Sequence, residues 1–513
     1  MRMLASFHRF PSRLRGLHLL SLRSQSLIAL IAGTLSVFSF APFNIFPLAA
    51  VCWAVLWLLW QRVSPRRAAW LGLVWGFGMF WAGGGWLYVA FHTYGGMAPW
   101  LTVFLLSIFF TYMASWGALA GWLFARLRSD KALFNTLLVA TCWTFGEWLR
   151  GWVFTGVPWL ALGYTQTPPS PLAGYAPLFG SYGVGFVLIC FTALLTLACI
   201  DKIPRRRALL AAFGIVALGG ALRLVAWTTP VGEPIRVSLI QPNIPQDMKW
   251  DPDSLQHWLE LNLELVRQNP AQLIALPETT LPLFEEQLSA EYLAKLSEPA
   301  RRFNGNVITG TFTRDAEGHV FNSALALGTD PRQVYSKRHL LPFGEFVPSS
   351  MRWLLDLVNI PMANQTRGVA GQAPIRVGDQ LVAVNICYED VFGEELIYAL
   401  PQATLMLNIS NLAWYGDYHA QPQHLQISRM RALEAGRPML RSTNSGMTAL
   451  VMPDGSVAQV LPAFTTGALT ALVRGYSGMT PYARWGNWPV LGMLAMVLVA
   501  ALRLTRAGRK RAT

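Results

Sequence analysis

The chain has 513 residues, is 53% hydrophobic and contains 21 tryptophans, which is more apolar than a soluble globule of this size requires. Its formal net charge is +14, which by itself would suit a nucleic-acid-binding protein. However, residues 233–475 carry 18 Lys plus Arg against 24 Asp plus Glu, whereas the remainder carries 23 against 3. The basic charge belongs to the apolar part of the chain, so it argues for membrane embedding and not for nucleic acid.

Eight apolar stretches predict membrane spans, most of them about as long as a bilayer core requires. They cover roughly 25–41, 43–60, 68–91, 98–125, 132–153, 178–200, 208–227 and 486–502. The first follows a basic start, as a signal peptide would. Because further spans follow and no convincing cleavage site is visible, we expect an uncleaved first helix.

Basic residues gather at alternate ends of these spans. The clusters are Arg2, Arg9, Arg13, Arg15 and Arg23; Arg62, Arg66 and Arg67; Arg126, Arg128 and Lys131; Lys202, Arg205, Arg206 and Arg207; and Arg503, Arg506, Arg509, Lys510 and Arg511. The loops at the other ends, such as APFN and HTYGGMAP, contain no Lys or Arg. By the positive-inside rule both termini are cytoplasmic and 233–475 lies on the opposite face of the membrane.

Glu147 and Arg150 are the only charged residues in or at the outer edge of the fifth predicted span. Two interpretations stay open: a structural salt bridge, or a contact for a lipid headgroup or other substrate. The stretch GSYGVG at 180–185 resembles a phosphate loop only superficially. It opens an apolar span, so we expect it to serve helix packing.

Residues 233–475 contain no membrane-length apolar run and are numerous enough to form one sizeable core. Short β-rich runs, such as IRVSLIQPN, QLIALPETT, NVITGTFT and LVAVNICYED, alternate with helical ones, such as SLQHWLELNLELVRQN and HLQISRMRALEAG. This order predicts a mixed α/β layer fold with several strands buried on both faces. The predicted domains are 1–232 in the membrane, 233–475 outside it, and 476–513 as a last span with a basic tail.

The segment 347–368 interrupts this pattern with a crowd of apolar residues that includes Trp353, Leu354 and Leu357. One interpretation is a helix that closes over the domain's own core. The other is an apolar arm that touches the lipid surface. Its place in the sequence, next to the chemically interesting residues, favours the arm.

Cys387 is the single cysteine between 233 and 475, because the other four, Cys52, Cys142, Cys190 and Cys199, lie in apolar spans. In an oxidising compartment a lone cysteine is either buried and inert or kept for its reactivity. It follows the apolar run LVAVNI and precedes a helix-like stretch. A thiol at the end of a strand and the start of a helix favours a thiolate and the oxyanion formed on attack at an acyl carbon.

A nucleophile needs a base. His419 and His424 follow a loop-like stretch with no evident orienting partner or zinc spacing, so we expect surface or packing histidines. Glu278 and Lys337 are better candidates, because each of them, like Cys387, ends an apolar run. The three side chains can therefore converge at one edge of a sheet.

These residues carry a family resemblance. Glu278 in LPETTLP, Lys337 in YSKRHLLPFGEFVP and Cys387 in NICYED resemble the Glu-Lys-Cys set of the nitrilase superfamily. The stretches QPNIPQDMKW, NISNLAWYGD and QISRMRALEAGRPMLRSTNSG, with eight flanking spans, are similar to the apolipoprotein N-acyltransferase family within it. The similarity covers the domain outside the membrane nearly end to end.

The resemblance implies a nitrilase-like αββα sandwich in the periplasm, carried on a helical bundle in the bacterial inner membrane. It also implies a two-step acyl exchange without a cofactor or metal. A phospholipid, typically phosphatidylethanolamine, gives an acyl chain to the thiol. The α-amine of a diacylglyceryl-cysteine apolipoprotein then takes it.

The resemblance further implies a role for each site residue. Glu278 is the general base, Lys337 stabilises the oxyanion, and Cys387 carries the acyl group as a thioester. Glu345 positions Lys337 and the base, Tyr388 and Glu389 shape the site after the nucleophile, and Trp250 holds the acyl chain or a lid. For Trp250 the alternative is core packing.

Two rival functions remain for the chain. A membrane-bound amidase would resolve the thioester with water, but eight spans and an apolar arm are excessive for a soluble substrate. A transporter with a soluble binding module is the other, but the spans show no inverted halves and few charges of the kind that carriers use.

Overall fold

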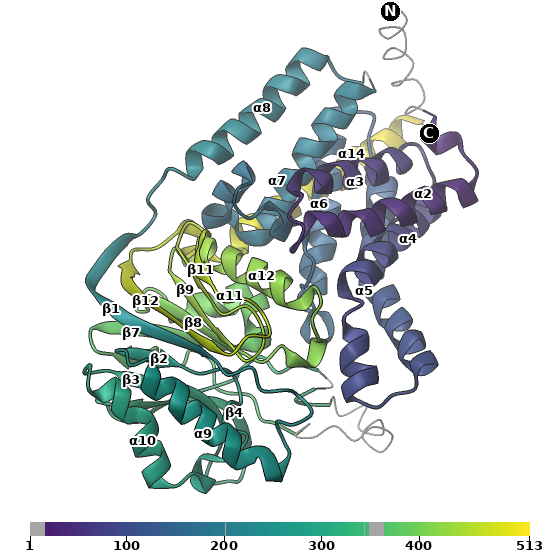
Figure 1. Ribbon diagram of the computed structural model, residues 1–513. Coiled ribbons are helices and arrows are strands. Elements are labelled where there is room, and N and C mark those ends of the chain that lie inside the picture. Colours follow the sequence, from purple (N-terminus) through teal and green to yellow (C-terminus); the bar gives the residue numbers. More distant parts are fainter. Residues whose placement is uncertain (1–15, 201, 343, 348–363, 513) are drawn as a thin grey trace, which may run out of the picture. The chain divides into compact units, whose positions relative to one another are not determined.

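The computed structural model describes residues 16–200, 202–342, 344–347 and 364–512, and Figure 1 colours them in chain order. The chain divides into two compact units. The first comprises residues up to Gly85, Trp100–Val225 and Trp485 onwards; the second comprises Trp86–Pro99 and Ala226–Arg484. Residues 86–99 therefore belong to the second unit, although in sequence they join two apolar helices of the first. The domain limits at 232 and 475 stay predictions.

The first unit consists of helices, and each predicted span overlaps one of them. They are α2 (Leu22–Leu35), α3 (Phe46–Leu59), α4 (Pro65–Gly84), α5 (Pro99–Leu127), α6 (Ala132–Arg150), α7 (Ala176–Cys199), α8 (Arg205–Leu222) and α14 (Trp488–Ala512). Among the described residues, four helical segments are long and apolar enough to cross a membrane: Leu22–Ser39, Pro99–Leu127, Pro171–Cys199 and Trp488–Ala507. The count of eight spans stays a prediction.

Tryptophan rings fill the core of this unit. Trp53 and Trp75 each meet Trp143 edge to face, with ring centroids 6.2 and 5.3 Å apart. Helices α2 and α4 approach closely at Gly33, where an added Cβ would lie 1.9 Å from the carbonyl oxygen of Trp75. Small residues allow such backbone contact between apolar helices.

The second unit contains two six-stranded sheets. One has the order β12-β1-β2-β3-β4-β5, with β1 (Thr229–Gln241), β2 (Leu273–Ala275), β3 (Asn306–Arg314), β4 (Val320–Gly328), β5 (Gln333–Ser336) and β12 (Gly467–Ser477). The other has the order β11-β10-β9-β8-β7-β6, with β6 (Ile375–Val377), β7 (Gln380–Ile386), β8 (Leu405–Ser410), β9 (Met439–Thr443), β10 (Ala449–Val451) and β11 (Val457–Val460). Strands β1, β2 and β3 run parallel, as do β7, β8 and β9.

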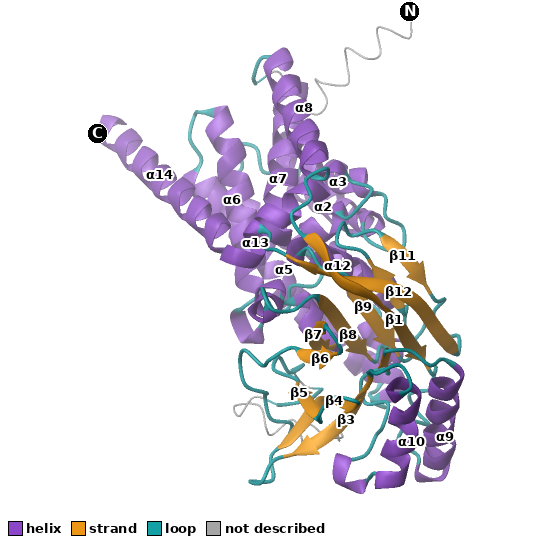
Figure 2. Cartoon of the chain, turned by 90° about the vertical axis from the view of Figure 1, so that its left-hand side faces the viewer, coloured by secondary structure: helices purple, strands orange, loops and turns teal. Residues whose placement is uncertain are grey.

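The two sheets face each other across a core of aliphatic side chains from both, including Val237 and Leu239 of β1 and Leu405 and Leu407 of β8. Helices α9 (Pro252–Gln268) and α10 (Ala290–Arg301) cover the outer face of the first sheet (Figure 2). Helix α12 (Ala420–Ala435) covers the outer face of the second. The arrangement is an αββα sandwich, and the strands β2, β8, β9 and β10 are buried at every position because both of their faces are covered.

The stretch after Cys387 differs from the helix that the sequence predicts. It is a short 3₁₀ turn, η9 (Cys387–Val391), followed by the four-residue α11 (Gly393–Leu396), so its helix dipole is small. Trp353, Leu354 and Leu357 lie outside the described residues, and both interpretations of their segment stay predictions.

Candidate active site

Three strands of the second unit deliver the predicted set to one place. Lys337 directly follows β5, Cys387 directly follows β7, and Glu278 lies three residues beyond β2. The Lys337 Nζ atom lies 3.1 Å from Glu278 Oε1 and 2.7 Å from Glu345 Oε1. The Cys387 thiol lies close enough to Glu278, Lys337 and Glu345 for their charges to act on it. The structure thus brings Glu278, Lys337, Cys387 and Glu345 together.

Hydrogen-bond donors hold both carboxylates in place. The Asn322 side-chain amide donates to Glu278 Oε1 and to Glu345 Oε1, 3.0 Å in each case. The backbone N–H of Asn411 donates to Glu278 Oε2 at 3.0 Å, and that of Leu341 donates to Glu345 Oε2 at 2.8 Å. Carboxylates with this many donors are fixed in orientation.

The environment pushes the pKa values of base and nucleophile apart. Burial raises the pKa of the Glu278 carboxyl group, but Lys337, Asn322 and Lys249 outweigh it and leave the pKa below its usual value. Burial and the neighbouring Glu278 raise the pKa of the Cys387 thiol, and the charge of Lys337 cancels only part of this increase. The resting site therefore holds a neutral thiol beside a carboxylate. The sequence-based expectation of a favoured thiolate is wrong because the helix after Cys387 is short and the surroundings are buried.

The Lys337 ammonium remains charged in this setting. Burial lowers its pKa, yet the negative charges of Glu278 and Glu345 raise it well above the ordinary value. A permanent cation sits 2% exposed beside the thiol. Such a preorganised charge is suited to stabilising an oxyanion.

The turn at Cys387 has a strained backbone and is held by the side chain of Glu389. Cys387 has φ of +53°, a left-handed conformation that costs free energy for a residue with a side chain. Glu389 accepts from the backbone N–H of Ile386 at 2.7 Å and from those of Arg338 and His339 at 2.6 and 3.0 Å. Its carboxylate thus ties the nucleophile turn to the loop after Lys337.

Tyr388 and Trp250 occupy different environments. Tyr388 is 9% exposed and packs edge to face on Phe392, with ring centroids 5.3 Å apart. Trp250 is 42% exposed and lies 6.0 Å from the Phe312 ring. Its exposure argues against the core-packing alternative.

The main chain at Glu278 passes directly over strand β3. Thr279 has φ of +46°, and a Cβ at Gly310 would lie 2.4 Å from its nitrogen and 2.7 Å from Glu278 Cα. Only glycine fits this approach, so Gly310 lets the base reach the site.

Sequence reasoning missed several groups at the site. Asn322, Asn411 and Lys249 all contact Glu278. The sequence could have identified Asn411, because it ends the apolar run TLMLNISN just as Glu278, Lys337 and Cys387 end their apolar runs. Lys249 directly precedes the chosen Trp250, whereas Asn322 lies near the start of a strand, where nothing distinguishes it from a structural asparagine.

A segment from between the apolar helices also takes part in this unit. It contains a short π-helical stretch, η3 (Val89–Tyr94). Trp86 packs edge to face on Tyr415 at 4.6 Å and donates its indole N–H to Gln423 at 3.2 Å, while Tyr94 packs on Trp414 at 5.9 Å. The segment thus braces the loop that begins at Asn411.

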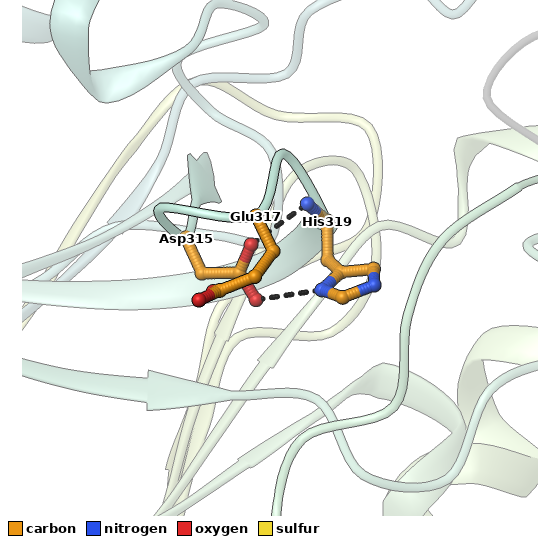
Figure 3. Close-up of side chains that lie close together, drawn as sticks. All are labelled: Asp315, Glu317 and His319. Atoms are coloured by element: carbon orange, nitrogen blue, oxygen red, sulfur yellow. Dashed lines mark hydrogen bonds and ion pairs between the residues drawn. The ribbon is translucent and has the colours of Figure 1, made fainter.

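The histidines play no part in the set. His424 is 1% exposed on α12, lies 3.3 Å from Arg441 and keeps a pKa well below the usual value because it is buried. Asp315, Glu317 and His319 come together in the turn between β3 and β4 (Figure 3). The Asp315 carboxylate accepts from the His319 backbone N–H and pairs with its ring, both at 2.8 Å, so the turn's own hydrogen bonds account for the cluster.

Glu147 and Arg150 belong to the first unit and are both buried. Glu147 Oε1 accepts from the backbone N–H of Leu162 at 2.9 Å. Arg150 donates to the carbonyl oxygens of Val157 and Trp159 at 2.7 and 2.5 Å. Both side chains hold the loop after α6, which favours the structural interpretation.

Comparison with known proteins identifies the family. A family model described as apolipoprotein N-acyltransferase N-terminal domain matches residues 32–195, and one described as carbon-nitrogen hydrolase matches residues 236–482. The apolipoprotein N-acyltransferase of Nitrosomonas europaea is 44% identical over 493 residues, which cover 94% of this chain and 98% of the relative. This chain belongs to the apolipoprotein N-acyltransferase family.

A second curated relative agrees with this assignment. The apolipoprotein N-acyltransferase of Chromobacterium violaceum is 42% identical over 481 residues, which cover 93% of each chain. The crystal structure of a carbon-nitrogen hydrolase from Helicobacter pylori G27 matches with a TM-score of 0.35 and 17% identity, over 47% of this chain and 89% of that one. The chain is an acyltransferase and a bacterial membrane protein, and its second unit contains a carbon-nitrogen hydrolase domain.

Proposed function

We propose that the chain moves a fatty acyl group from a membrane phospholipid, through a thioester on Cys387, to the α-amine of a diacylglyceryl-cysteine apolipoprotein. The observation that carries the proposal is the ion pair of Lys337 with a buried, deprotonated Glu278, placed where both charges act on the Cys387 thiol. The names of the relatives supply the acceptor class. Phosphatidylethanolamine is the proposed donor.

In the first half-reaction, Glu278 takes the thiol proton as the sulfur attacks the ester carbon. The tetrahedral oxyanion that forms is stabilised by the Lys337 ammonium. The C–O ester bond then breaks, the leaving oxygen of the lysophospholipid takes the proton from Glu278, and the acyl group stays on sulfur. Proton transfer during attack is required because the resting thiol is neutral.

In the second half-reaction, the acceptor amine loses a proton to Glu278 and attacks the thioester. The oxyanion forms at the same place, and its collapse breaks the C–S bond. The leaving thiolate recovers the proton from Glu278, so the amide is released and the enzyme is regenerated. The thioester divides one hard transfer into two easier ones.

The alternating basic clusters support an inner-membrane location with cytoplasmic termini and a periplasmic catalytic unit. This orientation would place the acyl transfer on the outer leaflet, where both lipid substrates are within reach.

Intact-mass measurement of the full-length protein in detergent, incubated with phosphatidylethanolamine alone, tests the proposal. We expect one acyl adduct that neutral hydroxylamine removes, and no adduct on Cys387→Ala. The joint replacement of Cys52, Cys142, Cys190 and Cys199 by serine should leave the adduct in place. An adduct that persists in Cys387→Ala contradicts the mechanism, and rapid release of free fatty acid without acceptor would favour an amidase.

A further inference from the structure

Lys249 is a buried lysine that the mechanism above does not use. It lies in the loop between β1 and α9, where it is 2% exposed. Its Nζ atom donates to the main-chain oxygen of Glu278 at 3.3 Å, and it lies close enough to Glu278 and Cys387 for their charges to act on it. Buried lysines are rare and costly unless they are paired.

The charges around the nucleophile do not balance without it. Two carboxylates, Glu278 and Glu345, share the single ammonium of Lys337. During the proposed reaction one negative charge moves from Glu278 to sulfur and then to the acyl oxygen. Arg441 also acts on Cys387, but it is paired with Asp390 at 3.1 Å. The site therefore carries one uncompensated negative charge at every stage unless another cation is near. Lys249 can supply this cation, because its Nζ atom lies 3.3 Å from the main-chain oxygen of Glu278 and the charge of Cys387 acts on it.

We propose that Lys249 is a second buried cation of the site, which balances the negative charge as it moves from Glu278 to Cys387 and on to the acyl oxygen. It acts through these two residues and exchanges no proton with the substrate, so it is a positioning residue. The inference rests on the proposed function, since it assigns Lys249 to the same thioester chemistry.

A purely structural role makes a different prediction. Lys249 as a mere anchor needs only a hydrogen-bond donor for the Glu278 carbonyl group, which glutamine also provides. As a counter-charge it needs a cation, which arginine provides. Lys249→Gln and Lys249→Arg therefore separate the two roles.

The pH dependence offers a second test. The groups that act on Cys387 are Glu278, Glu345, Lys337, Lys249, Tyr415 and Arg441, together with His424 at its backbone. Burial lowers the pKa of Lys249 to about 8, although Glu278 and Cys387 act to raise it. The second cation is thus lost as the pH rises through about 8, whereas Lys337 keeps its charge.

The experiment measures two rates on the full-length protein in detergent. The first is alkylation of Cys387 by iodoacetamide at pH 7, followed by peptide mass spectrometry. The second is single-turnover acylation by phosphatidylethanolamine. We expect Lys249→Gln to slow both by about tenfold or more, as one pKa unit of the thiol implies, and Lys249→Arg to recover most of the loss. Lys295→Gln, at an exposed lysine of α10 paired with Glu291, is the matched control.

Several outcomes would overturn the inference. Rates of Lys249→Gln equal to those of Lys295→Gln would do so, as would a folded Lys249→Arg that is as slow as Lys249→Gln. If neither variant folds, the pH dependence of acylation by the wild-type protein tests the inference. The rate should then fall above about pH 8, and an undiminished rate at about pH 9.5 would exclude Lys249 as a second cation. Absence of any acyl adduct on wild-type Cys387 would instead refute the proposed function, and the alkylation rates stay interpretable in that case.

Discussion

Individual hydrogen bonds at Glu278 decide which groups at the site carry protons. The carboxylate receives donors from Lys337, Asn322 and the Asn411 backbone, whereas the half-buried thiol lies near negative charge. Groups whose pKa values are pushed apart in this way can serve as base and nucleophile without a preformed thiolate.

The pH profile of acylation follows from the lowered pKa of Glu278. The pKa of Glu278 in the folded protein lies below that in the unfolded chain, so Glu278 remains a carboxylate at a lower pH than an ordinary glutamate does. It ceases to act as a base only when the pH falls through the folded pKa. We expect single-turnover acylation to be constant between about pH 5 and 7, given an ordinary glutamate pKa of about 4.3. Asn322→Ala removes one donor and should move the acid limb to higher pH. An unchanged limb in a folded variant would contradict this assignment.

Glu389 stabilises the fold of the site through its acceptor oxygens. In Glu389→Gln one oxygen becomes an amide N–H group that faces backbone donors, so we expect a loss of about 2 kcal/mol in the free energy of unfolding and much slower acylation. Thermal melting in detergent measures the effect. Glu298→Gln, which removes an exposed ion pair with Arg302, should cost well under about 1 kcal/mol. Equal melting temperatures of the two variants would show that the hydrogen bonds to Glu389 make no net contribution to the free energy of unfolding.

At the scale of elements, the segment 86–99 and the loop after β8 form one structural feature. The loop begins at Asn411, which holds the base, and continues through Trp414 and Tyr415, on which Tyr94 and Trp86 pack. Each aromatic pair adds roughly 0.5–1.5 kcal/mol beyond its buried area. The segment therefore helps to fix the orientation of Glu278 from a distance.

Trp86→Ala should loosen this loop. We expect faster amide hydrogen exchange at 411–416 and acylation slowed by about threefold to tenfold, since roughly 1 kcal/mol of packing is lost. Trp86→Phe keeps a ring and should retain most of the activity. Trp122→Ala, at a half-exposed position of α5, is the control, and exchange at 411–416 that responds equally to both alanine variants would refute the coupling.

At the scale of the whole molecule, the two units have opposite electrostatic character. Residues 233–475 carry six more acidic than basic residues, whereas the rest of the chain is strongly basic. Span ends that carry arginine and lysine tend to stay on the cytoplasmic side of the membrane. An acidic domain is not held on that side by its charge. The charge distribution therefore predicts cytoplasmic termini and a domain 233–475 on the opposite face of the membrane.

Reporter fusions test this orientation. A reporter after residue 513, or in the loop at Arg66, should read as cytoplasmic, and one at Glu317 as extracytoplasmic. Glu317 is an exposed residue of the β3–β4 turn, so an insertion there should be tolerated (Figure 3). A cytoplasmic signal at Glu317 would contradict both the orientation and the proposed substrates.

The sequence was sufficient for features that depend on local pattern. Apolar runs that end in Glu278, Lys337 and Cys387 predicted that these side chains converge. The ion pair of Lys337 with Glu278, and the effect of both charges on Cys387, bear this out. Short apolar runs predicted that several strands are buried on both faces, and the complete burial of β2, β8, β9 and β10 confirms it. Periodicity and strand ends are properties of consecutive residues, so they can be read without a partner.

Only the tertiary structure decided the features that depend on distant residues. The neutral state of Cys387, the packing of Gly310 against the main chain at Glu278, and the donors Asn322 and Asn411 arise between elements that are far apart in the sequence. The same holds for Lys249 and for the segment 86–99, which hydropathy alone would assign to the membrane part. Burial and neighbouring charge set a pKa, and both are determined by which segments the fold brings together.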